Sequence, residues 1–188
     1  MFERDAASAG VDPVGGLFNT ADIKILICYV LSVTQEPLDA AMLSNVLHYE
    51  GIANAFEVSD AITSLQKNGM LMESPEKPGC FFVTREGNDV AKTLNTSLAM
   101  TVKERACKIA LKMLAREKNA RESSFEITHE NEKTYITCTA HDGTAPFLSV
   151  KMLVPDDTQA QFIKEQFLNR AGEIYSGIVK LLTNYKED

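Results

Sequence analysis

The chain has 188 residues, of which 45% are hydrophobic and 24% are charged, and its formal net charge at pH 7 is −7. This length accommodates one large domain or two small ones with a buried core, and the composition is that of a globular protein. No apolar run reaches the roughly 18 residues that a membrane-spanning helix needs, and the acidic N-terminus lacks the features of a signal peptide, so we expect a cytoplasmic protein without membrane contact.

Residues 1–17 predict a flexible N-terminal arm, because they combine small residues with Asp12-Pro13 and a Gly-Gly pair. Two helices are expected next. Asn19 or Thr20 can cap the first helix and Asp39 the second, because short polar side chains accept hydrogen bonds from the free N–H groups of a first turn. Helically spaced apolar residues predict one buried stripe in each helix, namely Ile23, Leu26, Ile27, Val30 and Leu31 in the first, and Met42, Leu43, Val46 and Leu47 in the second.

A third helix is expected from Ile52 to Gly69, with glycine closing its C-terminal end. Its inward row would be Val58, Ile62 and Leu65. At 100° per residue this orientation turns the opposite row toward solvent. That outward row contains Phe56, Asp60, Thr63, Ser64 and Lys67, with Glu57 at its margin.

Two short strands follow the third helix, at residues 70–72 and 81–84, and a Pro/Gly turn at residues 74–79 joins them. Helix, strand, turn and strand in this order form the second half of a winged helix-turn-helix. In DNA-binding versions of that fold the helix enters the major groove. Thr84-Arg85-Glu86-Gly87 is typical of a further helix after the wing. We therefore predict a winged helix-turn-helix domain at residues 18–95.

The remainder, residues 96–188, predicts a smaller α+β domain that serves in dimerisation or effector sensing. A helix is expected from Met100 to about Lys118, with Val102 and Ala106 on its apolar face. Three alternating segments then predict an antiparallel sheet. A long final helix would begin near residues 155–158, with Ile163, Phe167, Ile174, Ile178 and Leu181 turned inward. The fold class is thus α+β: a winged helix-turn-helix, a long helix, a three-stranded antiparallel sheet and a C-terminal helix.

DNA contact would use the third helix and the wing. Thr63, Ser64 and Lys67 are residue types that contact base edges, whereas Lys77 and Arg85 would contact phosphates. The charge distribution opposes this reading. Residues 1–95 hold six Lys and Arg against 13 Asp and Glu, a net charge of −7, and residues 96–188 hold 13 of each, a net charge of 0. Affinity for nucleic acid usually rests on neutralisation of phosphates by cations.

Two further surface features leave alternatives open. Phe56 either packs against the second helix or its own first turn, or it marks a contact with a protein partner. A basic stripe, Arg105, Lys108, Lys112 and Arg116, follows one face of the long helix. This stripe is either a solvated face or a partner for the acidic first half, and the other possibilities are contact with a phosphate backbone or a dimer seam.

Catalytic and metal-binding signals are weak. The chain has no G-x-S-x-G, P-loop or G-x-G-x-x-G pattern, so we expect neither an enzyme nor a cofactor. Cys138, His141 and Asp142 are the best cluster for a metal, but three groups around one turn are better explained as turn polarity, so no metal is expected. The four cysteines lie far apart and are expected to be free thiols in a reducing compartment.

Three stretches together carry a family resemblance: residues 54–65, Val83-Thr84-Arg85-Glu86-Gly87, and residues 173–179 after Val154-Pro155. The chain resembles, over nearly its full length, an uncharacterised bacterial family catalogued as a domain of unknown function. That family has an N-terminal winged helix and a C-terminal α+β half, and it is often labelled a predicted transcriptional regulator. The resemblance implies a homodimeric regulator with double-stranded DNA as its possible partner, and it carries no catalytic residues. A protein-interaction adaptor, or a small-ligand sensor using the C-terminal half, remains the alternative.

Overall fold

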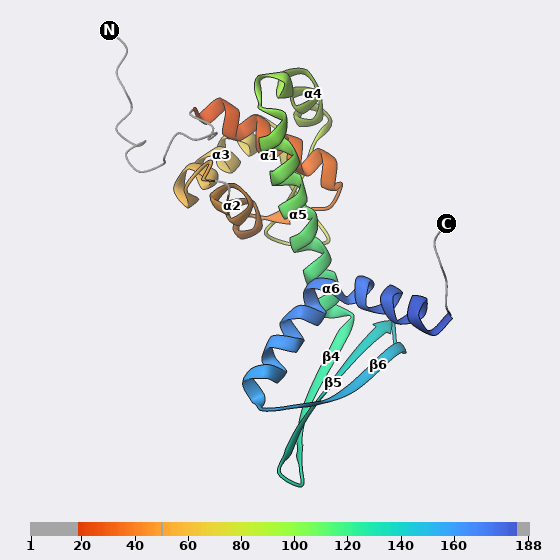
Figure 1. Cartoon of the computed structure of the whole chain (residues 1–188). Helices are drawn as coiled ribbons and strands as arrows, with labels where there is room; N and C mark the ends of the chain where they lie inside the picture. Colours follow the sequence, from red (N-terminus) through yellow and green to blue (C-terminus); the bar gives the residue numbers. More distant parts are fainter. Residues whose placement is uncertain (1–18, 50, 184–188) are drawn as a thin grey trace. The chain divides into compact units, whose positions relative to one another are not determined.

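The computed structural model describes residues 19–49 and 51–183, so the arm predicted at residues 1–17 lies outside the described part of the chain. The chain divides into two compact units, one ending at Leu111 and one beginning at Lys112. This division falls inside a single helix, α5 (Met100–Arg121), which follows a 3₁₀ turn at Asn95–Ser97. The boundary expected at residue 96 precedes that helix and stays a prediction. Figure 1 shows the chain coloured along its sequence, with labels on the helices and on the strands of the second unit.

The first unit combines helices with a small antiparallel sheet. Its helices before α5 are α1 (Thr20–Thr34), α2 (Ala40–Tyr49), α3 (Ala55–Lys67) and α4 (Arg85–Leu94). Its strands are β1 (Leu38–Asp39), β2 (Leu71–Glu73) and β3 (Cys80–Val83), in the order β1-β3-β2. The sequence predicted a two-stranded hairpin here, so the expected sheet count is wrong: the described part of this α+β chain contains two three-stranded antiparallel sheets. The missing strand is β1, where Leu38 pairs with Phe81.

Side-chain caps define where the helices of the first unit begin. Asn19 Oδ1 accepts the Asp22 N–H at 2.9 Å, and Asp39 Oδ1 accepts the Met42 N–H at 2.6 Å, so both predicted caps are confirmed. The predicted start of α3 at Ile52 is wrong. Asn54 caps this helix and takes part in a capping box, in which its side chain accepts the N–H of Glu57 and the Glu57 carboxylate accepts the N–H of Asn54.

The predicted apolar stripes form the core of the first unit. The buried side chains include Leu26, Ile27, Val30 and Leu31 of α1, Leu43, Val46 and Leu47 of α2, and Val58, Ile62 and Leu65 of α3. Met42, expected among them, is only half-buried. Gly69, which follows the C-cap residue Asn68 of α3, has φ 69°, the left-handed conformation predicted for this glycine.

Thr84 and Gly87 join α4 to the segment that follows α3. The Thr84 hydroxyl donates to the Gly69 carbonyl at 2.8 Å and accepts the Gly87 N–H at 3.2 Å. Gly87 is buried so closely that a Cβ atom there would lie 2.3 Å from the Met70 carbonyl oxygen. The Thr-Arg-Glu-Gly segment is therefore a close-packed corner, in which the last position has no room for a side chain.

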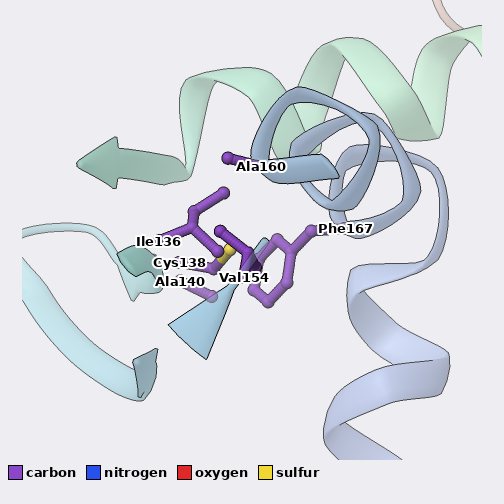
Figure 2. Packing of buried hydrophobic residues seen from close by; sticks show 6 residues of the cluster. All are labelled: Ile136, Cys138, Ala140, Val154, Ala160 and Phe167. Carbon is purple, nitrogen blue, oxygen red and sulfur yellow. The ribbon is translucent and has the colours of Figure 1, made fainter. Parts of the chain in front are cut away.

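The second unit is a β-meander covered on one face by a helix. Its strands are β4 (Ser123–Glu130), β5 (Lys133–Asp142) and β6 (Ala145–Val154), and all neighbours are antiparallel in the order β4-β5-β6. The helix is α6 (Asp157–Thr183). Figure 2 shows the core between them, built from Ile136, Cys138, Ala140, Val154, Ala160 and Phe167. The rings of Phe167 and Phe125 meet edge to face at 5.7 Å between their centroids.

The last helix bends instead of running straight. Arg170 has φ −139° and ψ 23°, which breaks the helical geometry, and α6 changes direction there (Figure 1). Phe167 and Ile163 pack on the sheet as predicted, but Leu181 is 82% exposed, so its predicted inward position is wrong. None of the helices in the described part of the chain is both long and apolar enough to span a membrane.

Candidate nucleic-acid interface

The outward face of α3 carries hydrogen-bonding side chains along its length. Among the residues predicted to contact base edges, Thr63 and Lys67 are exposed and Ser64 is half-buried. Ser59 and Gln66 are exposed as well, and the sequence reasoning missed them. Their spacing of four and three residues from Thr63 was the available signal, because residues at those intervals share a helix face. The structure thus presents a continuous polar row, Ser59, Thr63, Gln66 and Lys67, which we call the α3 row.

The charge of Glu57 is directed at the start of its own helix. Its Oε2 accepts the backbone N–H of Asn54 at 2.8 Å, and its side chain is only partly exposed. A carboxylate in the first turn also interacts favourably with the helix dipole. Glu57 therefore stabilises the start of α3, whereas Asp60 is an exposed negative charge beside the α3 row.

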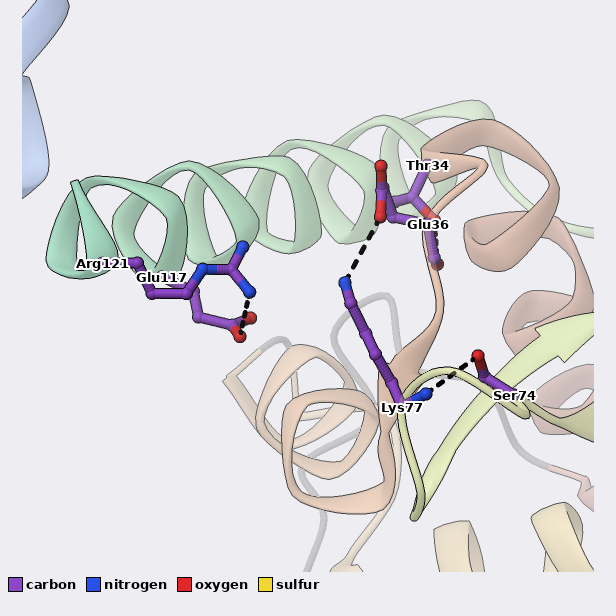
Figure 3. Close-up of polar contacts among 6 residues, drawn as sticks. All are labelled: Thr34, Glu36, Ser74, Lys77, Glu117 and Arg121. Carbon is purple, nitrogen blue, oxygen red and sulfur yellow. Dashed lines mark hydrogen bonds and ion pairs between the residues drawn. The ribbon is translucent and has the colours of Figure 1, made fainter. Parts of the chain in front are cut away.

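The turn between β2 and β3, which the sequence predicts to be a wing, is held by its own polar contacts. Figure 3 shows the Lys77 ammonium directed at the Glu36 carboxylate, 3.5 Å away, while the Lys77 backbone N–H donates to Ser74 Oγ at 3.3 Å. The Glu73 carboxylate accepts the Gly79 N–H at 2.6 Å. Lys77, expected to contact phosphate, is thus paired with an acid of the same unit. Surface pairs of this kind contribute about 0–1 kcal/mol, so a phosphate could displace Glu36.

Arg85 is exposed at the first residue of α4, close along the chain to the end of β3. The five predicted DNA-contacting residues therefore lie on one unit, but their side chains differ in exposure and in the partners that they already have. Lys67 and Arg85 present exposed side chains, Lys77 is paired, and the Thr63 hydroxyl already donates to the Ser59 carbonyl at 3.0 Å. Their combined positive charge is small for a phosphate-binding surface.

Two aromatic side chains flank the turn between α2 and α3. Phe56 is 84% exposed, which contradicts the first of its two alternatives, packing against α2 or its own first turn, and leaves the second, a contact with a protein partner, as a prediction. Its position in the first turn of α3, immediately after the capped start, leaves it without covering neighbours. Tyr49, the last residue of α2, is 81% exposed and was not predicted, because it lies beyond Leu47, the last residue of the apolar stripe in that helix. Large exposed aromatics close together in the chain mark a contact surface more often than scattered apolar residues do.

The four residues of the predicted basic stripe on α5 differ in their exposure and contacts. Arg105, Lys108 and Lys112 are exposed, whereas Arg116 is half-buried. Arg116 Nη2 lies 2.5 Å from the Glu165 carboxylate and Nη1 donates to Asn169 Oδ1 at 3.0 Å. Within the second unit, Arg116 therefore fastens the end of α5 to α6.

Three of the four cysteines are buried, and one of these three, Cys138, belongs to the candidate metal cluster. Cys28, Cys107 and Cys138 are buried free thiols, and burial raises the pKa of Cys28 and of Cys107 to about 11. Burial also raises the pKa of the Cys138 thiol, which lies in the core beneath α6. In the described part of the chain, no three His, Cys, Asp or Glu side chains are placed to hold a metal ion.

Comparison with known proteins gives one family. A family model described as a domain of unknown function (DUF4364) matches residues 23–182. Neither the curated proteins nor the solved structures contain a match. The matched range includes both three-stranded sheets and all of the residues predicted to contact DNA.

Proposed function

We propose, for a chain that belongs to the DUF4364 family of domains of unknown function, a role as a winged-helix regulator that contacts double-stranded DNA through α3. The observation that carries the proposal is the α3 row: four exposed hydrogen-bonding side chains follow one face of a capped helix that precedes a hairpin. Ser, Thr, Gln and Lys are all residue types that contact base edges in the major groove.

The arrangement around α3 supports a winged helix-turn-helix. α2 and α3 are joined by a short turn, and β2 and β3 follow directly as an antiparallel hairpin. β1, inserted between α1 and α2, completes the sheet by pairing with β3. In this reading α3 is the recognition helix, and the turn between β2 and β3 is the wing.

The available charges predict weak, moderately salt-dependent binding. Lys67 and Arg85 offer two exposed cations, and Lys77 becomes a third if it exchanges Glu36 for a phosphate. Two or three phosphate contacts give a slope of log K against log salt of roughly −2 to −3. A homodimer, which we include in the proposal, would raise the affinity by presenting two copies of α3 to two half-sites.

The experiment starts from random-sequence duplexes selected on the immobilised full chain. Binding of the enriched duplex is then measured by fluorescence anisotropy at several salt concentrations. Replacing Lys67 and Arg85 together by alanine should weaken binding and reduce the magnitude of the salt slope by about 2 for each bound copy of the chain, because each cation contributes about one phosphate contact. Removing the same charge elsewhere in the unit, by Lys24→Ala with Lys92→Ala, should leave the slope unchanged. Absence of selectable duplexes, or a slope equal in all variants, would refute the proposal.

A second candidate function, a protein-interaction adaptor, is favoured by the exposed pair Tyr49 and Phe56. The unit around them is acidic, with Asp60 exposed on the same helix as Phe56. A complementary partner would be a segment with an apolar anchor flanked by Lys or Arg, because aromatic side chains bind most strongly in a pocket surrounded by matching charge.

A peptide library displayed on phage tests this second candidate. Selection on the full chain should enrich peptides with an apolar residue beside basic ones, and Phe56→Ala should weaken their binding at least about tenfold, since removing an aromatic anchor at the centre of an interface costs about 2 kcal/mol or more. Phe162→Ala, which removes an exposed ring from α6, is the matched control and should have no effect. If the selected peptides bind the Phe56 variant equally well, the aromatic pair is not an adaptor site.

A further inference from the structure

The second half of α6 has an apolar face wider than its own sheet covers. After the bend at Arg170, Ala171 and Ile174 pack against the core of the second unit. Leu182, on the same helix, is 81% exposed, and Tyr175 is 43% exposed. A helix that is apolar over more than one stripe is normally buried on more than one side.

The pattern of this segment is that of a helix-pairing seam. Ala171, Tyr175, Ile178 and Leu182 are separated by four, three and four residues, which is the spacing of core positions in a coiled coil. The positions that flank the seam are also uncharged, namely Gly172, Ile174, Val179 and Leu181. The charged residues Glu173 and Lys180 are seven residues apart and both lie on the opposite face.

The patch continues from the helix onto the sheet. The Phe147 ring, at the β-bulge of β6 opposite His141, meets the Tyr175 ring edge to face at 5.2 Å between centroids and is itself 52% exposed. We call the exposed parts of Phe147, Tyr175, Val179, Leu181 and Leu182 the α6 patch. If each side chain offers on the order of 150–200 Å² when free, their exposed fractions amount to roughly 500 Å² of apolar surface. A standard interface buries about 800 Å² per partner, so the α6 patch with a polar rim is sufficient for one.

We propose that the α6 patch is the surface through which two copies of this chain form a two-fold dimer. The uncharged seam and flanks favour a second copy over a different protein, because charges at flanking positions are what select unlike partners and what would repel like ones. Homodimer interfaces are also more apolar than transient ones. This inference deepens the dimer included in the proposed function, and it places the dimer seam on α6 instead of on the basic stripe of α5.

The experiment measures mass by sedimentation equilibrium across the micromolar range. The unaltered chain should sediment at twice its 20.7 kDa mass, and Leu182→Glu should weaken the dimer by about 100-fold or more, because a two-fold interface loses the same buried leucine twice. Leu182 is exposed within one chain, so this variant should fold normally. Thr183→Glu, which adds the same charge at the next residue, about 100° around the helix and outside the seam and its flanking positions, is the matched control and should remain dimeric.

Two outcomes would overturn the α6 patch: a chain that stays monomeric at every concentration, or equal dissociation constants for Leu182→Glu and Thr183→Glu. The test is independent of DNA. The Lys67→Ala, Arg85→Ala double variant should remain a dimer, so loss of DNA binding and loss of dimerisation are distinguished. A dimer that persists without DNA binding supports the α6 patch and refutes only the DNA part of the proposed function.

Discussion

Gly87→Ala is expected to lower the free energy of unfolding of the first unit by about 3 kcal/mol or more, because the added methyl group overpacks a closed site. A Cβ atom at this position would lie 2.3 Å from the Met70 carbonyl oxygen and 2.8 Å from Val83 Cγ2. The first of these neighbours is backbone, so it cannot rotate away. Alanine's better helix propensity, about 1 kcal/mol, does not compensate for such a contact. Urea unfolding followed by circular dichroism measures the difference.

The matched control is Gly177→Ala in α6. A Cβ atom there meets nothing within 4 Å, and Gly177 is also helical. The same substitution should therefore stabilise the chain slightly, by about 0.5–1 kcal/mol, through helix propensity alone. If both variants change stability by the same amount and in the same direction, the close packing of α4 on the segment after α3 is not what makes Gly87 necessary.

Phe167→Ala should lower the stability of the second unit by about 3–5 kcal/mol, the usual cost of removing a buried phenylalanine. Phe167 is 2% exposed, belongs to the core cluster drawn in Figure 2 and packs edge to face on Phe125. Two members of the same cluster, Ala140 and Ala160, are too small to fill the space that the ring would leave. Amide hydrogen exchange, read separately for β5 and for α1, should show loss of protection in β5.

Phe162→Ala serves as the control for this second prediction as well. Phe162 is 56% exposed on the same helix, so its removal should change the free energy of unfolding by no more than about 0.5 kcal/mol. Equal destabilisation by the two alanine substitutions would contradict the assignment of Phe167 to the core. Unchanged protection of β5 in Phe167→Ala would contradict it too.

Sequence patterns predicted the helices whose caps and buried faces depend on residues close together in the chain. The stripes of α1 and α2 follow helical spacing, and their caps at Asn19 and Asp39 lie next to the apolar runs that they begin. β1 could not be predicted in this way. It has two residues, too few to show alternation, and it exists because Leu38 meets Phe81 far along the chain. The start of α3 could have been found, since Asn54 and Glu57 have the spacing of a capping box.

The candidate site was predicted less well than the fold. Helical spacing correctly placed the Phe56 side chain on the outward face of its helix. It could not predict whether another residue covers the ring, because that depends on where α2 ends. The pairing of Lys77 with Glu36 joins two turns that no local pattern connects. The bend at Arg170 follows no proline, so nothing in the sequence indicated that Leu181 would leave the sheet. The pairing of Lys77 shows the difficulty most directly, because it depends on a contact between distant segments of the chain.

The order β4-β5-β6 leaves the outer strands of the second sheet, β4 and β6, with one edge each that no described strand pairs with. Such edges can recruit strands from other molecules and start aggregation. The chain carries the usual safeguards. Pro146 removes one N–H donor from β6, the β-bulge beside His141 interrupts its regular ladder, and Lys151 and Glu130 place charges on the two outer strands. These residues therefore protect solubility during synthesis and folding, even where they contribute little to the folded state itself.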